Sequence, residues 1–116
     1  MWEVEVGLIE DWLLSLADDD YDLILASLEV LQTEGPMLGR PLVDTIKGSR
    51  HKNMKELRPG SGGRSEVRIL FAFDPRRKAI LLVAGDKSRN WSRWYTRNIP
   101  VADQRFDDHL KHLKEG

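Results

Sequence analysis

The chain has no cysteine and no long apolar run, and both absences narrow what it can be. Without cysteine among its 116 residues there is no disulfide framework and no thiol nucleophile, as is common in a reducing cytoplasm. The apolar run 80–85 is too short to cross a bilayer, because a membrane helix needs about 20 apolar residues. The N-terminus also lacks the basic-then-apolar pattern of a signal peptide. We therefore expect a cytoplasmic protein without membrane contact.

Basic residues are scarce at the N-terminus and abundant in the middle of the chain. The first 46 residues hold eleven acidic residues and a single basic one, Arg40. From Lys47 to Arg97 the balance reverses, with 14 of the 18 Lys and Arg residues against four acidic residues. A surface of that charge density concentrates a polyanion and speeds its encounter with the protein. Two interpretations follow: a nucleic-acid site, or a solvated basic surface that balances the acidic half.

The apolar periodicity predicts one α+β domain over residues 1–116, with elements in the order β-α-α-β-β-β-α. The elements are a strand at 2–6, helices at 9–17 and 21–33, strands at 52–58, 66–74 and 79–85, and a C-terminal helix. An aspartate within 18–20 is expected to cap the second helix, and the Gly- and Pro-rich segment 35–49 is expected to be a connector. Asn98 is expected to cap the last helix, with Pro100 in its first turn and an apolar stripe of Val101, Ala102, Phe106, Leu110 and Leu113.

These elements predict a two-layer fold with a mainly antiparallel sheet and the helices on one face. The other face is expected to be free and to belong to the basic segment. In strand 66–74 every second residue belongs to the core face: Val67, Ile69, Phe71 and Phe73. Arg68 then points the opposite way, and with Leu57 in the core, Glu56 and Arg58 join it. We expect these three to cluster on the concave free face; a cross-strand pair that only fixes register is the alternative.

Residues 86–95 (DKSRNWSRWY) alternate aromatic and basic side chains. Aromatic rings stack on unpaired RNA bases while cations hold phosphates. The alternative is that Trp91 and Trp94 anchor the C-terminal helix on the sheet. His109 and His112 share a helix face at i, i+3, but no third ligand is in view, so we expect no metal site and no cofactor.

Three segments resemble the RelE/ParE superfamily of bacterial toxins, most closely its HigB-like, phage-derived killer-protein branch. They are residues 53–58 (NMKELR), 67–74 (VRILFAFD) and 85–95 (GDKSRNWSRWY). The resemblance covers nearly the whole chain, because the N-terminal helical pair and the Gly-Pro connector also fit. It implies a RelE-like fold.

The resemblance also implies an activity and partners. Such toxins enter the ribosomal A site and cut the messenger RNA there without a metal, which inhibits translation. An antitoxin, often a helix-turn-helix DNA-binding protein, neutralises them, and the complex represses its own operon. Operator DNA is then contacted only through the antitoxin.

The motif match assigns candidate catalytic residues. Arg68 corresponds to the strand arginine that stabilises the phosphate, and Arg58 to the arginine closing the preceding strand. Lys87 or Arg89 corresponds to a further phosphate contact, and Tyr95 to the C-terminal group that assists proton transfer.

Residue 56 departs from the RelE pattern, which has two lysines spaced by one residue before its Leu-Arg. Here those positions are Met54 and Glu56. Glu56 could act as the base if desolvated, or Lys52 and Lys55 could supply charge from the edge. The candidate RNA-binding cations are Lys52, Lys55, Arg64, Arg89 and Arg93.

Two rival functions remain open: a ParE-like toxin that inhibits gyrase by binding alone, and a toxin-derived module that has lost catalysis. Convergence of Arg68 with Glu56, Lys87 and Tyr95 favours the nuclease. Dispersal of these residues, or burial of Arg68 in ion pairs, favours the rivals. Because Arg68 is expected off the core face, Arg68→Ala is expected to abolish growth inhibition and leave the fold intact.

Overall fold

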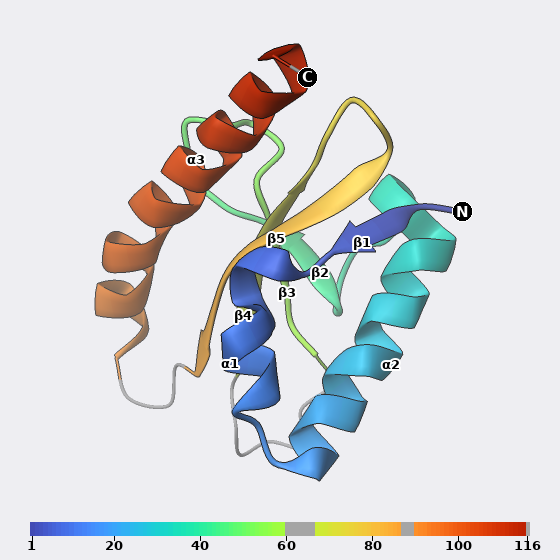
Figure 1. The fold of residues 1–116 in the computed structure, drawn as a ribbon. Coiled ribbons are helices and arrows are strands. Elements are labelled where there is room, and N and C mark those ends of the chain that lie inside the picture. The colour runs from blue at the N-terminus through green and yellow to red at the C-terminus, as the bar shows by residue number, and fades with distance from the viewer. Residues whose placement is uncertain (60–66, 87–89, 116) are drawn as a thin grey trace.

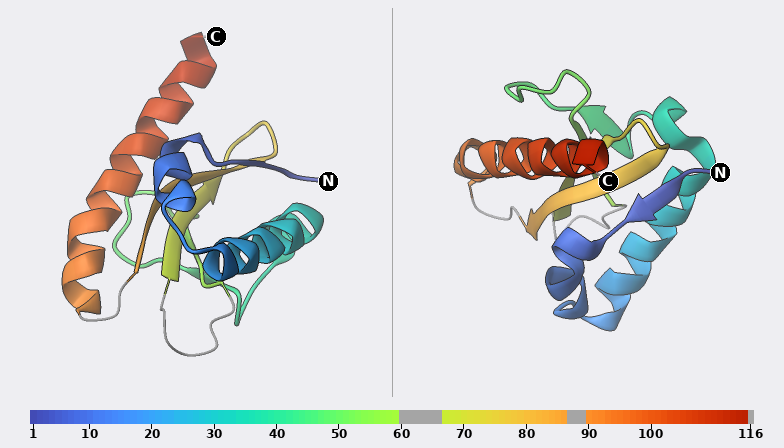
Figure 2. Two further views of the ribbon diagram at one scale, coloured as in Figure 1. Left: turned by 60° about the horizontal axis from the view of Figure 1, so that its bottom comes forward. Right: turned by 45° about the horizontal axis from the view of Figure 1, so that its top comes forward.

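A five-stranded sheet separates two helical layers (Figures 1 and 2). The structure is a computed structural model and describes residues 1–59, 67–86 and 90–115. Its elements in chain order are β1 (Glu3–Glu5), the 3-10 turn η1 (Gly7–Ile9), α1 (Glu10–Leu14), α2 (Asp18–Glu34), the 3-10 turn η2 (Gly35–Met37), β2 (Val43–Thr45), β3 (Lys55–Leu57), β4 (Val67–Phe73), β5 (Lys78–Asp86) and α3 (Trp91–Glu115).

The sheet has the strand order β1-β5-β4-β3-β2, in which only the β1–β5 pair is parallel. The predicted α+β class and mainly antiparallel sheet are thus confirmed. A hairpin joins β4 and β5 between the two strands predicted at 66–74 and 79–85, because Asp74 accepts hydrogen bonds from the backbone N–H groups of Arg76 and Lys78.

Helices cover both faces of the sheet, so the prediction of helices on one face is wrong. On one face α1 and α2 pack against the odd-numbered residues of β4, such as Ile69 and Phe71. On the other face α3 places Ala102 and Phe106 over Leu70. The face expected to be free is apolar as well, and a strand apolar on both faces is buried on both.

A β-bulge in β5 adjusts the α3 side of the sheet. Leu70 pairs with Val83 and Phe71 with Leu81, which leaves Leu82 as the extra residue. The bulge places Gly85 opposite Arg68. A Cβ atom at Gly85 would lie 2.5 Å from Nε1 of Trp94, so this position requires glycine for the close approach of the indole.

Two predictions for the N-terminal half are wrong: one strand was missed, and the cap of one helix was misassigned. The expected connector 35–49 contains β2, whose three residues are too few to show an alternating pattern. The N-cap of α2 is Ala17, and no aspartate side chain caps the helix. The aspartates of 18–20 instead occupy its first turn, where their charge suits the positive end of the helix dipole.

Helix α3 begins seven residues before its expected cap. Asn90 accepts a hydrogen bond from the N–H of Arg93 at the true start, while Asn98 lies inside the helix and donates to the carbonyl of Trp94. Pro100 is also interior, and Val101 is exposed rather than part of the apolar stripe. None of the helices among the described residues has the length and apolar character needed to cross a membrane.

The contact between Gly85 and Trp94 makes a stability prediction. Gly85→Ala should lower the free energy of unfolding by about 1–3 kcal/mol, because the new methyl group must displace the indole. Gly39→Ala is the matched control, since nothing lies within 4 Å of its added Cβ. Urea denaturation of both variants measures the effect, and equal midpoints for the two would refute the proposed close contact.

Candidate functional site

Four predicted site residues meet around one buried carboxylate, and we call them the Glu56 cluster: Glu56, Arg58, Arg68 and Tyr95. Glu56 is 1% exposed. Its Oε2 lies 3.0 Å from Nε of Arg58, and its Oε1 lies 3.4 Å from Nε of Arg68. The phenol of Tyr95 donates a hydrogen bond to the same Oε1. Two cations and one hydroxyl donor therefore neutralise and solvate a charge that burial alone would strongly disfavour.

Strand register explains why the cluster forms. Glu56 pairs with Leu70 of β4 and, on its other side, with Asp44 of β2. Side chains at these facing positions share the α3 side of the sheet, and Arg68 is the diagonal neighbour two residues from Leu70. Asp44 also forms an ion pair with Arg58, in which Oδ2 lies 3.4 Å from Nη2. Helix α3 then supplies Tyr95 from above.

Arg68 is not on a free face, which corrects the sequence-based expectation. Its side chain is 12% exposed beneath α3. Nη1 donates to the carbonyl of Val67 at 2.9 Å, and the guanidinium carbon lies 5.0 Å from the centre of the Trp91 ring. Nε makes no hydrogen bond to any described residue despite its proximity to Glu56. Arg68 is thus a structural partner of Glu56, and its Nε–H remains as a hydrogen-bond donor without an acceptor among the described residues.

The electrostatics of the cluster keep its donors protonated. Burial, and then the hydrogen bond and charge of Glu56, raise the pKa of Tyr95 to about 12. Burial acts to lower the pKa of Arg58, but its hydrogen bond to Glu56 and the charges of Glu56 and Asp44 outweigh this and raise it. At neutral pH the phenol is therefore a proton donor and the guanidinium a fixed cation.

The cluster opens on a cleft of about 300 Å³. Glu56, Arg58 and Tyr95 line it together with four residues that sequence reasoning missed: Thr45, Ile46, Lys47 and Ile99. Three of these follow from the missed strand β2, because its pairing with β3 brings residues 45–47 beside Glu56. The cleft therefore exposes an edge of the cluster to a ligand.

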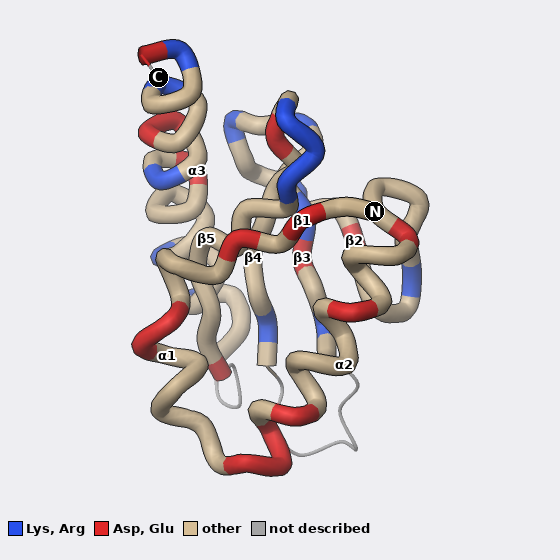
Figure 3. Tube along the Cα trace, turned by 45° about the vertical axis from the view of Figure 1, so that its right-hand side comes forward, with Lys and Arg blue, Asp and Glu red and all other residues tan. Residues whose placement is uncertain are grey.

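The predicted RNA-binding cations are more dispersed. Lys55 belongs to the opposite face of β3 by strand parity, and Lys52 and Arg93 are exposed but do not line the cleft. Arg64, Lys87 and Arg89 lie outside the described residues. Figure 3 shows acidic residues along α1 and α2 and basic residues in β3, in β4 and at the β4–β5 hairpin. The charge separation seen in the sequence is partly lost in space, because Lys78 pairs with Glu3 and Glu5.

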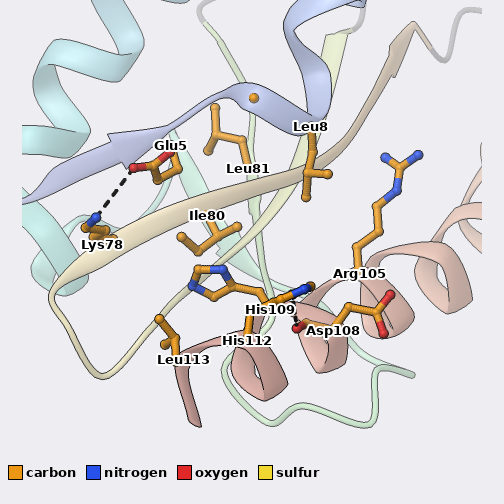
Figure 4. A pocket seen from close by; sticks show the side chains of 11 residues that line it. Glu5, Leu8, Lys78, Ile80, Leu81, Arg105, Asp108, His109, His112 and Leu113 are labelled. Carbon is orange, nitrogen blue, oxygen red and sulfur yellow. Dashed lines mark hydrogen bonds and ion pairs between the residues drawn. The ribbon is translucent and has the colours of Figure 1, made fainter. Parts of the chain in front are cut away.

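A larger cavity of about 440 Å³ lies between η1, β5 and α3 (Figure 4). None of the predicted catalytic or RNA-binding residues that the structure describes lines it. His109 lines this cavity, and its Nε2 lies 2.8 Å from Oδ2 of the buried Asp74. Burial alone would raise the pKa of Asp74. The hydrogen bonds from His109 and from backbone N–H groups outweigh burial and lower that pKa. Across the described part of the chain, no three His, Cys, Asp or Glu residues are grouped as metal ligands.

Comparison of the sequence with known proteins identifies a family and two relatives. Residues 11–107 match the family described as "Phage derived protein Gp49-like (DUF891)". The chain is 57% identical over 114 residues to "Putative toxin HigB2" of Mycobacterium tuberculosis (strain ATCC 25618 / H37Rv), covering 98% of this chain and 57% of that protein. It is 50% identical over 102 residues to "Putative toxin HigB3" of the same strain, covering 88% of this chain and 87% of that protein.

The chain therefore belongs to the phage-derived Gp49-like family. Within that family it groups with the HigB-like toxins, as the resemblance predicted. It spans only 57% of the length of HigB2, although it matches most of HigB3.

The raised pKa of Tyr95 makes a prediction for alkaline pH. The fold favours the protonated phenol, so this contribution to stability is complete below pH 10.0 and is lost as the pH rises towards about 12. In an absorbance titration, Tyr95→Phe should remove the tyrosinate step at the highest pH, whereas Tyr21→Phe should leave that step in place. Its survival in Tyr95→Phe would show that the phenol is not held by Glu56.

The burial of Arg68 changes the expected effect of its removal. Arg68→Ala should lower the free energy of unfolding by about 2 kcal/mol, because Glu56 loses one of its two cations in a buried site. Repeating the substitution in a Glu56→Gln background should roughly halve the loss, since no buried carboxylate is then left short of a cation. Equal losses in both backgrounds, measured by denaturant titration, would mean that the ion pair contributes nothing.

Proposed function

We propose that this protein is the toxin of a type II toxin–antitoxin pair and acts as a ribosome-dependent, metal-independent mRNA endoribonuclease that inhibits translation. The observation that carries the proposal is the Glu56 cluster, in which a carboxylate, two guanidinium groups and a phenol from three separate elements meet beside an open cleft. These are the residue types that RNA cleavage by the 2′-hydroxyl requires.

In the proposed reaction the 2′-oxygen forms a bond to the adjacent phosphorus while the bond from phosphorus to the 5′-oxygen breaks. A base takes the proton of the 2′-hydroxyl, and an acid gives a proton to the departing 5′-oxygen. The products are a 2′,3′-cyclic phosphate and a 5′-hydroxyl. Cations must stabilise the charge that develops on the phosphoryl oxygens.

The cluster offers one group for each requirement. Glu56 is the proposed base, because it is the carboxylate that lines the cleft. Arg58 and Arg68 are the proposed charge-stabilising cations. Tyr95 is the proposed acid, because its pKa of about 12 keeps the phenol protonated at neutral pH. Since both oxygens of Glu56 are engaged in the free protein, the incoming phosphate must take over at least one of its guanidinium partners.

The proposed partners follow from the same assignment. Both relatives are named toxins, which supports a cognate antitoxin for this chain, here proposed to be a helix-turn-helix protein that also provides the contact with operator DNA. The basic residues that line the cleft, Lys47 and Arg58, suit the phosphates of ribosomal and messenger RNA. The acidic residues of α1 and α2 (Figure 3) offer a separate site for the antitoxin. Action on the ribosome implies a cytoplasmic location.

One observation favours a second candidate, a binding toxin of the ParE type or a toxin-derived module without catalysis. Arg68 is largely buried and its nearest anion is Glu56, the arrangement expected of a structural ion pair. Under this alternative the cluster would only join β3, β4 and α3, and the cleft would have no chemistry.

A purified translation system tests the proposal. Glu56→Gln preserves size and most hydrogen bonds but removes the base, so it should lower cleavage of a ribosome-bound message at least about a hundredfold. Binding of a non-cleavable 2′-deoxy analogue should be retained or tightened, because a competing negative charge is gone. Lys111→Ala, an exposed change near the C-terminal end of α3, is the control. Full activity of Glu56→Gln, or products without a cyclic phosphate, would contradict the mechanism.

A further inference from the structure

The segment 46–54 between β2 and β3 brings to the cleft a lysine that the proposed mechanism does not yet use. The backbone N–H of Ile46 donates to the carbonyl of Met54 at 2.9 Å, which closes the base of this segment. Lys47 then lines the cleft together with Glu56 and Tyr95. Lys47 follows the last residue of β2 by two positions, so the pairing of β2 with β3 brings it beside Glu56 and the fold of the segment fixes where it lies.

Helix α3 holds this segment through two acidic side chains one turn apart. Asp103 is 3% exposed, and it accepts hydrogen bonds from the hydroxyl of Ser49 and, at 3.0 Å, from the backbone N–H of Arg50. The hydroxyl of Ser49 in turn accepts the N–H of His51 at 2.9 Å. Asp107 forms an ion pair with the guanidinium of Arg50 and a hydrogen bond with Nε2 of His51 at 2.7 Å. A buried carboxylate is thus devoted to fixing one short segment.

The backbone between Lys47 and this attachment is also constrained. Gly48 has a φ of +93°, in the left-handed region that favours glycine. The turn therefore fixes the direction of the chain between Lys47 and Ser49. Together with the hydrogen bonds to Asp103, this holds the Lys47 backbone in one orientation beside the cleft.

Lys47 differs in its charge balance from the two arginines of the Glu56 cluster, of which Arg58 also lines the cleft. Arg58 and Arg68 are already paired with Glu56, and Arg58 also with Asp44. Lys47 is exposed and makes no ion pair with any residue of the described ranges. It is the cleft cation that can bind a phosphate without first breaking an internal contact.

We propose that Lys47 is a catalytic residue that contacts the phosphate of the RNA bound in the cleft, and that Asp103 is a positioning residue that holds Lys47 there. This inference rests on the proposed ribonuclease function and deepens it. A phosphodiester reaching the cleft first meets Lys47, and the ammonium group then stabilises the charge on phosphorus while the arginines exchange Glu56 for the substrate.

A double-mutant cycle on cleavage of a ribosome-bound message tests both roles. Lys47→Ala should lower kcat at least about tenfold, Lys47→Arg should recover much of the loss, and Lys111→Ala should have no effect. Asp103→Asn should cause a similar loss, and the double variant Lys47→Ala/Asp103→Asn should be no worse than Lys47→Ala alone. Ser49→Ala, a milder change, repeats the test if Asp103→Asn lowers the melting temperature below the assay range.

The outcomes separate the inference from the proposed function. Binding of a 2′-deoxy RNA analogue should lose about one unit from its logarithmic salt dependence in Lys47→Ala, the signature of one phosphate contact. If wild-type protein cleaves and Lys47→Ala cleaves equally well, Lys47 has no role and the ribonuclease proposal stands. If the effects of Lys47→Ala and Asp103→Asn multiply, Asp103 supports only the fold. If wild-type protein does not cleave at all, the function and this inference fall together.

Discussion

The structure depends on the burial of one carboxylate, that of Glu56, between the sheet and α3. A charge in that position is stable only if cations and donors surround it, and Arg58, Arg68 and Tyr95 meet that need. Each comes from a different part of the chain, so the requirement ties the end of β3, the start of β4 and the first turns of α3 together. The same requirement creates the candidate active site.

Helix α3 is the element through which this constraint spreads. Trp94 packs on Gly85 of β5, and Tyr95 donates a hydrogen bond to Glu56 of β3. These two contacts attach the first turns of α3 to the sheet. Further along, Asp103 holds the segment before β3, and His109 contacts Asp74 in the β4–β5 hairpin. A helix expected only to cover a core thus also contacts the segment before β3 and the β4–β5 hairpin through its polar side chains.

Strand parity was enough to predict that Glu56, Arg58 and Arg68 share one face, because side-chain direction follows from period-two geometry alone. Parity could not show that this face is covered, since that depends on what packs above it. Leu70 and Ala72 could have indicated the cover, because both are apolar and belong to the face expected to be free. Both are buried under α3. The sequence was therefore enough to predict which side chains share a face, and not enough to predict that α3 covers this face.

Two other errors have local causes. Asn98 and Pro100 are typical of a helix start, but both lie inside α3. An interior proline removes one backbone hydrogen bond and crowds the carbonyl four residues earlier, and packing on the sheet offsets this cost. The strand β2 has three residues, too few for a pattern, and without it Lys47 could not be assigned to the cleft. The segments 60–66 and 87–89, with Arg64, Lys87 and Arg89, lie outside the described residues.

The central claim is that the Glu56 cluster cuts RNA on the ribosome. The most direct measurement is primer extension on two messages that differ only in a start codon, after inducible expression of the wild-type protein in a bacterial host. Ribosome-dependent cleavage would give cuts within the reading frame of the translated message and none in its untranslated twin. Growth arrest with both messages intact would contradict it and would favour a toxin that acts by binding alone.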